Sequence, residues 1–291
     1  SLAKIGDNSP TNHKFVVLHK PNLPVPPLDM VIIENKHLSR PNWAVFLSWC
    51  AINSVQILMV RDYIERTTGT VDLNGFELGE AIQLLTAKKY LYFKRVFDLI
   101  ASTTLLLLLS PMFLILTILI PLASVGPAFF IQERIGLGGI KFKMYKFRSM
   151  KLESQPAPAS FTEHSDNRVT KIGHFIQKTH IDELPQLLNV IKGDMSIIGP
   201  RPEQVSFTNE FQKTIPGFYM RNCIRPGITG WAQILCGYAD DIESSRKKVS
   251  YDLFYIRHLS LFLDISICIQ TIKLVLFSFG NDEQSITSSW R

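Results

Sequence analysis

The feature that most constrains this chain is a run of 34 residues without a formal charge, Leu99–Gln132. If the first part of the run, Leu99–Val125, forms one continuous helix, that helix is about 40 Å long, whereas the hydrocarbon core of a bilayer is about 30 Å thick. Its length therefore permits a membrane-spanning helix. A re-entrant hairpin, which enters one leaflet and returns to the same side, is the alternative.

Two observations favour the hairpin. Ser110-Pro111 lies near the middle of the run, where proline removes a backbone hydrogen bond and bends a helix. Basic residues flank both ends, with Lys88, Lys89, Lys94 and Arg95 before the run and Arg134, Lys141, Lys143, Lys146, Arg148 and Lys151 after it. Because such residues collect on the cytoplasmic side, a hairpin satisfies both clusters and a spanning helix only one. We therefore predict a hairpin, with a proline-kinked spanning helix as the alternative.

Composition narrows the class of protein. The 291 residues include 31 Lys and Arg against 25 Asp and Glu, which gives a net charge of +6, and 46% are hydrophobic while 19% are charged. Such a composition disfavours intrinsic disorder, and a nucleic-acid-binding protein would have a larger basic excess on a more polar chain. A mildly basic, apolar chain suits an anionic membrane surface or phosphorylated substrates, so we expect no nucleic-acid partner.

Changes in composition along the chain predict two regions. Residues 1–93 form an N-terminal region whose role no motif indicates, and residues 94–291 form the second region. Within the second region, residues 94–128 would form the membrane hairpin and residues 129–291 a small cytoplasmic domain. The uncharged residues 43–60 of the first region are compatible with a buried helix or with a membrane span, and the sequence leaves both open.

The pattern of the second region predicts a membrane-associated α+β fold. Two strands joined by a glycine-rich turn are expected at residues 129–135 and 140–147. Short helices are expected after them, at residues 171–178, 182–191 and 246–257. Residues 259–279 are again apolar but contain Asp264 and Lys273, and a charge at bilayer depth costs about 2.5–3.5 kcal/mol. We therefore expect an amphipathic helix at the membrane interface, with a buried core helix as the alternative.

The densest polar cluster combines two adjacent carboxylates, Asp182 and Glu183, with Arg201. The carboxylates stand at an expected helix start, where the helix dipole favours them, so capping is the plain structural interpretation. Adjacent carboxylates can also bind Mg²⁺ together with a diphosphate, or one can attack phosphorus while the other helps to bind the metal. Arg201, between Pro200 and Pro202, would present a rigid guanidinium to a phosphate.

Several motifs follow one another in an order that is typical of one family. They are Lys94-Arg-Val-Phe-Asp98, Ser110-Pro111, Gly126-Pro127, Gln132-Glu-Arg134, Lys146-Phe-Arg-Ser-Met150, Asp182-Glu-Leu-Pro-Gln186, Asn189-Val-Ile-Lys-Gly-Asp-Met-Ser196, Gly199-Pro-Arg-Pro202 and Arg225-Pro-Gly-Ile-Thr-Gly-Trp-Ala-Gln233. With these motifs, residues 94–275 resemble the bacterial sugar transferases, the monotopic phosphoglycosyl transferases that load polyprenyl phosphate.

The resemblance implies an enzyme, an undecaprenyl-phosphate sugar phosphotransferase. Asp182 would attack the sugar-linked phosphate of a UDP-sugar and release UMP, and undecaprenyl phosphate would then take the phosphosugar from Asp182. This transfer would be the first membrane step in the assembly of a surface polysaccharide, such as an exopolysaccharide or O-antigen. The transferred sugar is not determined by these motifs.

The resemblance also assigns roles to other residues. Glu183 would help to bind Mg²⁺, Arg201 would bind phosphate, and Lys146 and Arg148 would lie near the phosphates on a basic strand. The family usually has arginine where this chain has Gln177, so either the affinity for phosphate is lower or Lys178 substitutes as a phosphate-binding residue. The position of Asp252 is acidic in the family, and a metal-binding or structural role is expected for it.

The resemblance places the protein at the cytoplasmic face of a bacterial inner membrane, in contact with membrane lipids. The hairpin would return at Ser110-Pro111, and Arg95 and Asp98 would pair at its mouth. The additional N-terminal region could mediate a homodimer. Two rival functions remain, a lipid-diphosphate hydrolase that uses the same carboxylates and a non-catalytic membrane adaptor of a polysaccharide assembly complex.

Overall fold

The computed structural model describes residues 21, 28–38, 40–73, 88–151, 168–236 and 241–278. The remaining parts of the two predicted regions, including the chain ends, lie outside the described residues. The chain divides into two compact units, the smaller unit Ser1–Asp72 and the larger unit Leu73–Arg291. The predicted boundary at residues 93 and 94 stays a prediction.

The smaller unit is built around a parallel pair of strands. Strands β1 (Met30–Ile33) and β2 (Gln56–Met59) pair in parallel, and helices α2 (Asn35–Leu38) and α3 (Pro41–Ile52) connect them, while α4 (Val60–Thr68) follows β2. One face of α3 is buried against β1. The uncharged residues 43–60 divide into a helix of 12 residues, in which Trp43, Phe46 and Cys50 are buried, and a strand. The helix is too short to cross a membrane and is buried on one face only.

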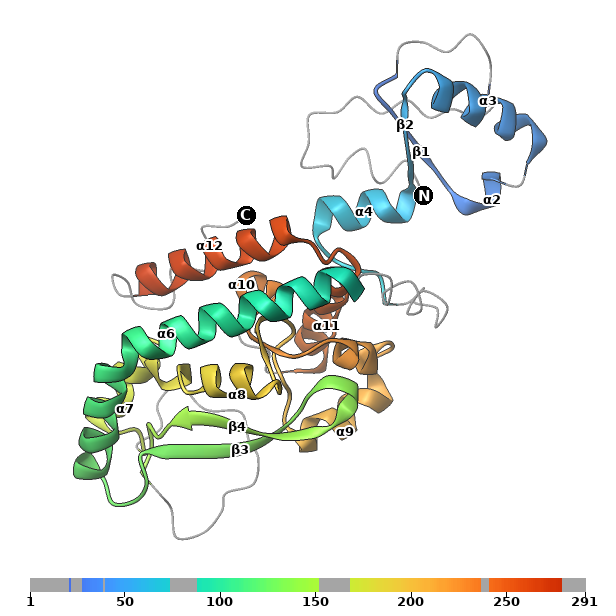
Figure 1. Cartoon of the computed structure of the whole chain (residues 1–291). Coiled ribbons are helices and arrows are strands. Elements are labelled where there is room, and N and C mark those ends of the chain that lie inside the picture. Colours follow the sequence, from blue (N-terminus) through green and yellow to red (C-terminus); the bar gives the residue numbers. More distant parts are fainter. Residues whose placement is uncertain are drawn as a thin grey trace. The chain divides into compact units, whose positions relative to one another are not determined.

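The longest element of the larger unit is helix α6 (Lys88–Ala123), which contains Pro111 and Pro121. It is the one helix of the described residues that is long and apolar enough to cross a membrane. Figure 1 shows that α6 changes direction along its length. A proline inside a helix removes one backbone hydrogen bond and clashes with the preceding turn, so the bend has a local cause.

The predicted hairpin of strands follows α6. Strands β3 (Phe129–Ile135) and β4 (Lys141–Phe147) pair antiparallel around a short 3₁₀ turn, η2 (Leu137–Gly139), and their bounds agree with the sequence prediction to within one residue. Helix α8 (Gln186–Lys192) covers the other edge of β4 through Asn189. The Asn189 side chain accepts from the Tyr145 amide at 3.0 Å and donates to the Lys143 carbonyl at 2.7 Å. These bonds fix the hairpin to α8.

A second, parallel pair of strands lies close to α8. It consists of β5 (Ser196–Ile198) and β6 (Gly227–Thr229). A Cβ atom at Gly227 would lie 2.1 Å from the Gly199 nitrogen, and one at Gly230 would lie 2.2 Å from the Gly199 carbonyl oxygen. Only glycine permits this approach of two backbones, which explains the glycines of the two motifs.

The remaining helices complete the larger unit. They are α7 (Lys171–Lys178), α9 (Val205–Thr214), the 3₁₀ helix η4 (Phe218–Cys223), α10 (Trp231–Leu235), α11 (Ile242–Arg257) and α12 (Leu261–Ser278). Helix α12 contacts both parallel strands. In Figure 1, α12 lies alongside the first part of α6. The buried Asp264 of α12 joins the two helices, because its carboxylate lies 2.8 Å from Lys94 Nζ and accepts from the Tyr90 hydroxyl at 2.6 Å.

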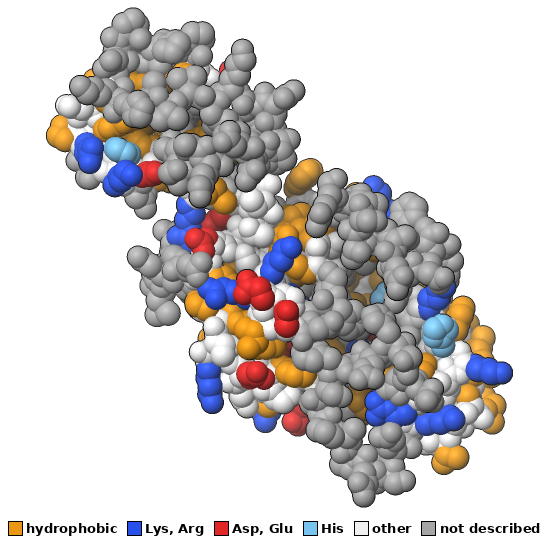
Figure 2. All heavy atoms as spheres, turned by 180° about the vertical axis from the view of Figure 1, so that it is seen from behind, with side chains coloured by type: hydrophobic (Ala, Val, Ile, Leu, Met, Phe, Trp, Pro, Cys, Tyr) orange, Lys and Arg blue, Asp and Glu red, His pale blue; other side chains and the backbone are white. Residues whose placement is uncertain are grey.

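The outer face of α12 is apolar. Phe262, Ile265, Ile269, Ile272 and Leu276 follow helical spacing and are exposed, as are many leucine and isoleucine side chains of α6. On the face of the molecule in Figure 2, hydrophobic side chains reach the surface among Lys and Arg side chains. Helix α12 thus contacts α6 with one face and exposes an apolar face on the other side, which agrees with the predicted helix at a membrane interface. The larger unit is thus an α+β structure with apolar helices suited to membrane association.

Candidate active site

Asp182 and Glu183 lie in a 3₁₀ turn, η3 (Ile181–Glu183), which separates α7 from α8. His180 precedes this turn with a positive φ of 54°, and its carbonyl accepts from the Glu183 amide at 3.2 Å. Left-handed backbone is strained at a residue other than glycine and turns the chain sharply. The helix predicted over 182–191 therefore begins only at Gln186, and the two carboxylates stand on the turn before it.

Two cations hold Glu183. Lys146 Nζ, from β4, lies 2.7 Å from Glu183 Oε1. Arg201 Nη2 lies 2.5 Å from the same oxygen, and Arg201 Nη1 donates to Oε2 at 3.1 Å. Burial raises the pKa of Glu183, but Arg201 and Lys146 outweigh it and hold that pKa well below its usual range. The structure therefore brings together three of the predicted site residues, with Glu183 ionised at neutral pH.

The neighbouring carboxylate is in a different state. Asp182 is buried, and among the described residues its carboxylate has no hydrogen-bond or ion-pair partner. Burial and then the adjacent Glu183 raise the pKa of Asp182 to about 6, although Lys146, His180 and Arg201 act in the opposite direction. A desolvated, unpaired carboxylate close to cations is chemically suited to nucleophilic attack.

The loop that carries Arg201 is fixed from three sides. The Pro200 carbonyl accepts from the Gly227 amide at 2.9 Å, the Arg201 carbonyl accepts from Arg221 Nη2 at 2.9 Å, and the Pro202 carbonyl accepts from Arg134 Nη1 at 3.2 Å. Prolines have no backbone N–H group, so the loop is held mainly through its carbonyls. Arg201 is thereby presented to Glu183 from a rigid backbone.

Sequence reasoning missed two of these residues. Arg134 was noted only as part of a motif and of the basic flank, and that motif, Gln132-Glu-Arg134, was the signal that could have identified it. Arg221 had no signal of its own, because it lies in the 3₁₀ helix η4 outside every motif. Both act on the backbone of a loop that is distant in sequence.

Arg148 binds backbone carbonyls and does not join the cluster around Glu183, so its predicted place near the phosphates stays a prediction. Its side chain is buried and donates to the carbonyls of Ser124 at 2.6 Å and Val125 at 2.8 Å, just beyond the end of α6. Strand β4 ends at Phe147, one residue earlier, so Arg148 does not continue the row of Lys146. A cation at the C-terminal end of a helix binds the free carbonyls there, and this contact occupies the guanidinium.

The predicted pair of Arg95 and Asp98 does not form a direct ion pair. Arg95 Nη1 donates to the Val190 carbonyl at 2.6 Å, and Asp98 Oδ1 accepts from the Ile197 amide at 3.1 Å. Each side chain therefore attaches the start of α6 to a different segment of the larger unit. The two side chains thus bind backbone groups of α8 and β5 and not each other.

Lys178 lies outside the cluster around Glu183. It is exposed at the end of α7, and it has no ion pair or hydrogen bond with the described residues. The preceding Gln177 donates to the Ser149 hydroxyl at 2.8 Å. In this structure Gln177 thus attaches α7 to the end of β4, and a phosphate-binding role for Lys178 stays a prediction.

Asp252 has a structural partner. It is buried, and its Oδ2 lies 2.6 Å from Arg221 Nη2. Arg221 also pairs with Glu203, which in turn binds Lys248 at 2.7 Å. Of the two roles expected for Asp252, these contacts favour the structural one, because its carboxylate supports the arginine that holds the Arg201 loop.

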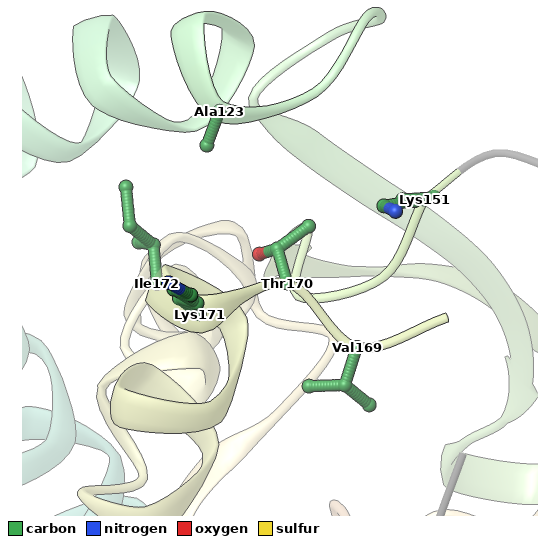
Figure 3. Close-up of a pocket in the computed structure, with 6 residues that line it drawn as sticks. All are labelled: Ala123, Lys151, Val169, Thr170, Lys171 and Ile172. Carbon is green, nitrogen blue, oxygen red and sulfur yellow. The ribbon is translucent and has the colours of Figure 1, made fainter. Parts of the chain in front are cut away.

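A pocket of about 440 Å³ opens at the start of α7, and Ala123, Lys151, Val169, Thr170, Lys171 and Ile172 line it (Figure 3). It lies where the end of α6, the end of β4 and the start of α7 meet. Asp182, Glu183 and Arg201 are not among its lining residues. The candidate site is therefore the polar cluster on η3 and not this pocket.

Comparison with known proteins identifies the family of this chain. A family model described as bacterial sugar transferase matches residues 89–278, which include Asp182, Glu183 and Arg201. The chain belongs to the bacterial sugar transferase family. The resemblance found in the sequence is thereby confirmed.

Three bacterial relatives show how far the similarity extends. UDP-N-acetylgalactosamine-undecaprenyl-phosphate N-acetylgalactosaminephosphotransferase of Aeromonas hydrophila is 39% identical over 285 residues, which are 96% of this chain and 67% of the relative. UDP-glucose:undecaprenyl-phosphate glucose-1-phosphate transferase of Escherichia coli (strain K12) is 42% identical over 181 residues, which are 62% of this chain and 39% of the relative. The protein of the same name from Caulobacter vibrioides is 39% identical over 185 residues, 63% of this chain and 69% of the relative.

These relatives carry the names of the enzyme class that the sequence predicts, undecaprenyl-phosphate sugar phosphotransferases. The chain spans about two thirds of the Aeromonas protein and less than half of the E. coli protein. The alignment with the Aeromonas protein covers nearly the whole chain, so the similarity of this bacterial sugar transferase to that relative extends beyond the range of the family model.

Proposed function

We propose that this protein transfers a sugar 1-phosphate from a UDP-sugar to undecaprenyl phosphate, with Asp182 as the nucleophile. The observation that carries the proposal is the contrast between two adjacent carboxylates. Glu183 is bound by Lys146 and Arg201, whereas Asp182 is buried beside the same cations without a partner of its own among the described residues. The names of the relatives supply the class of donor and acceptor.

In the first step, an Asp182 carboxylate oxygen attacks the phosphorus atom that carries the sugar. A bond forms between that oxygen and phosphorus, the bond from phosphorus to the bridging oxygen of the diphosphate breaks, and UMP leaves with the electron pair. The phosphosugar is then attached to Asp182 as an acyl phosphate. In the second step, an oxygen of undecaprenyl phosphate attacks the same phosphorus, and the Asp182 carboxylate is released.

Arg201 and Lys146 would stabilise the charge that develops on the phosphate oxygens. In the structure both bind Glu183, so the site holds its cations in place before a substrate enters. A preorganised guanidinium fork and an ammonium group favour the transition state because they need little rearrangement when charge develops. Glu183 would thus act as the anchor that positions these two cations.

The two carboxylates also fit a bound Mg²⁺. Proteins commonly bind this ion through one or two carboxylates, while waters and substrate phosphate oxygens complete the octahedron. Asp182 and Glu183 provide two, and the described residues contain no group of three or more His, Cys, Asp or Glu side chains that would form a complete protein site. When bound with substrate, Mg²⁺ would neutralise part of the diphosphate charge.

We further propose that α6 is a re-entrant hairpin in the cytoplasmic leaflet. The start of α6 is attached to the larger unit by Arg95 on the Val190 carbonyl, and the segment after its end is attached by Arg148 on the Val125 carbonyl. Both ends therefore contact the same unit, with a proline bend between them. A straight spanning helix would place its ends on opposite sides of the bilayer. Membrane lipids would contact its exposed apolar faces, and homodimerisation stays a prediction.

The decisive experiment is UMP release by the purified, membrane-inserted protein. UDP-glucose and UDP-N-acetylgalactosamine head a panel of donors, with and without undecaprenyl phosphate and with Mg²⁺ or a chelator. We expect release that requires Mg²⁺, one donor and, for sustained turnover, the lipid phosphate. Asp182→Asn should abolish both the release and a phosphosugar adduct detected by mass spectrometry. Activity of Asp182→Asn close to that of the wild type would refute the nucleophile.

The same assay separates the rival functions. A hydrolase would release product continuously without undecaprenyl phosphate, because water would be its acceptor. An adaptor would release no UMP with any donor, and its complexes would be unaffected by Asp182→Asn. The cations arranged around Glu183 favour the transferase, because an adaptor does not require them.

A further inference from the structure

Arg134 is attached to the same loop as Arg201. The four successive backbone carbonyls of residues 200–203 accept hydrogen bonds from four different donors. Two of these donors come from the end of β3: Arg134 Nη1 donates to the Pro202 carbonyl, and the Ile135 amide donates to the Glu203 carbonyl. The end of β3 also forms a β-bridge with Gln204. The position of Arg134 relative to Arg201 is therefore fixed through backbone contacts.

The main partner of the Arg134 guanidinium is the side-chain amide of Gln132 and not a carboxylate. Gln132 Oε1 accepts from Arg134 Nη2 at 2.6 Å and from Nε at 3.1 Å. No carboxylate of the described residues lies within ion-pair distance of Arg134, and two of its five N–H groups have no partner there. Buried and half-buried charges are normally paired, because desolvation of an unpaired charge is costly.

The surroundings of Arg134 make its charge less favourable still. Burial and then the nearby Arg201 lower the pKa of Arg134 to about 10, although Glu203 and Glu183 act in the opposite direction. Lys146, Arg201 and Arg134 thus lie near the carboxylates of Asp182 and Glu183, while the third carboxylate, Glu203, is bound by Arg221 and Lys248. One positive charge is not neutralised by the protein itself when Asp182 is ionised.

We propose that Arg134 is a second guanidinium that binds the diphosphate of the donor, in addition to Arg201. The proposal rests on the proposed function, since it names a ligand group for the same substrate. A nucleoside diphosphate carries the charge that the cluster lacks, and its oxygens accept from the two N–H groups that the described protein leaves without partners. Gln132 would hold the guanidinium plane while the phosphate binds.

The first test measures binding of UDP, as the diphosphate probe, by calorimetry in the presence of Mg²⁺. Arg134→Gln should raise the Kd about 10- to 100-fold, the effect of losing hydrogen bonds to a charged group. Arg134→Lys keeps the charge and loses the planar fork, so its Kd should lie between. Lys213→Gln, on the exposed side of α9, removes a positive charge elsewhere and should leave the Kd unchanged.

The second readout compares the KM values for the two substrates, measured by UMP release with the preferred donor. Arg134→Gln should raise KM for the UDP-sugar, and KM for undecaprenyl phosphate should change much less. If Arg134 acts only by holding the loop of Arg201, Arg134→Gln should not raise the Kd any further in an Arg201→Gln background, and that result would overturn the inference. If only Arg134→Lys folds, a Kd for UDP equal to that of the wild type overturns it.

The outcomes separate this inference from the proposed function. If the wild type releases UMP and Arg134→Gln binds UDP normally, Arg134 is not a phosphate ligand and the transferase proposal stands. If the wild type releases no UMP with any donor while Arg134→Gln still weakens UDP binding, the transferase proposal fails and the binding role stands.

Discussion

Replacing the proposed nucleophile should stabilise the fold. Asp182 is buried, and its pKa is raised from 3.8 to about 6, first by burial and then by Glu183. A carboxyl group with a higher pKa in the folded state loses its proton less readily there, so ionisation destabilises the folded protein at pH values above about 4. The penalty is complete above about pH 6 and disappears as the pH falls below the unfolded-state pKa.

The magnitude follows from the shift. About two pKa units at about 1.4 kcal/mol each amount to a destabilisation of about 3 kcal/mol at pH 8, and the same linkage relation gives about 1.6 kcal/mol at pH 5. Asn has nearly the same size and does not ionise, so Asp182→Asn should recover this free energy. In a unit of about 200 residues, 3 kcal/mol corresponds to about 6–12 °C in melting temperature.

The assay is thermal unfolding of the purified protein and of Asp182→Asn at pH 8 and at pH 5. The variant should melt higher at pH 8, and the difference should be roughly halved at pH 5. Glu210→Gln, at an exposed position of α9, controls for the loss of a carboxylate and should shift stability by less than about 0.5 kcal/mol. A variant that is no more stable than the wild type at pH 8 would refute the reasoning.

Two further substitutions test the packing that supports the site. In chemical denaturation, Gly227→Ala should destabilise the larger unit by about 3 kcal/mol, because its Cβ would lie 2.1 Å from a facing backbone nitrogen. The control Gly138→Ala has φ +65° and no atom within 4 Å of the new Cβ, so it should cost only about 1 kcal/mol. Lys94→Ala should cost about 3–5 kcal/mol, because it leaves the buried Asp264 without its cation. The control Lys89→Ala, on the exposed side of the same helix, should have little effect. Equal losses of stability for a variant and its control would contradict the packing described for Gly227 or the ion pair described for Lys94.

The same titration of Asp182 predicts the pH dependence of transfer. Only the carboxylate can attack phosphorus, so the rate of UMP release should rise with pH through about 6 and then level off. Initial rates between pH 5 and pH 8, at donor concentrations well below KM, measure this profile, because kcat/KM reports the pKa values of the free enzyme. A rate that is constant across this range would show that the ionisation of Asp182 does not limit the reaction.

Local patterns in the sequence determined most of the elements. The apolar run predicts α6, the alternation of apolar and basic residues predicts β4, and the order of motifs predicts the family. The same patterns identified Asp182, Glu183 and Arg201, because adjacent carboxylates and a proline-flanked arginine are recognisable in the chain itself. These features depend on residues within a few positions of one another, which is the range over which periodicity and backbone restriction act.

The partners of the charged residues were decided only by the tertiary structure. Lys146 and Arg148 look alike in the sequence, yet β4 ends between them, so one reaches Glu183 and the other reaches the end of α6. Likewise, nothing near Arg134 or Arg221 shows that both hold the loop of Arg201. Hydrogen bonds and ion pairs act over a few ångströms, and which groups come that close depends on how distant segments cross, which the packing of the whole unit determines.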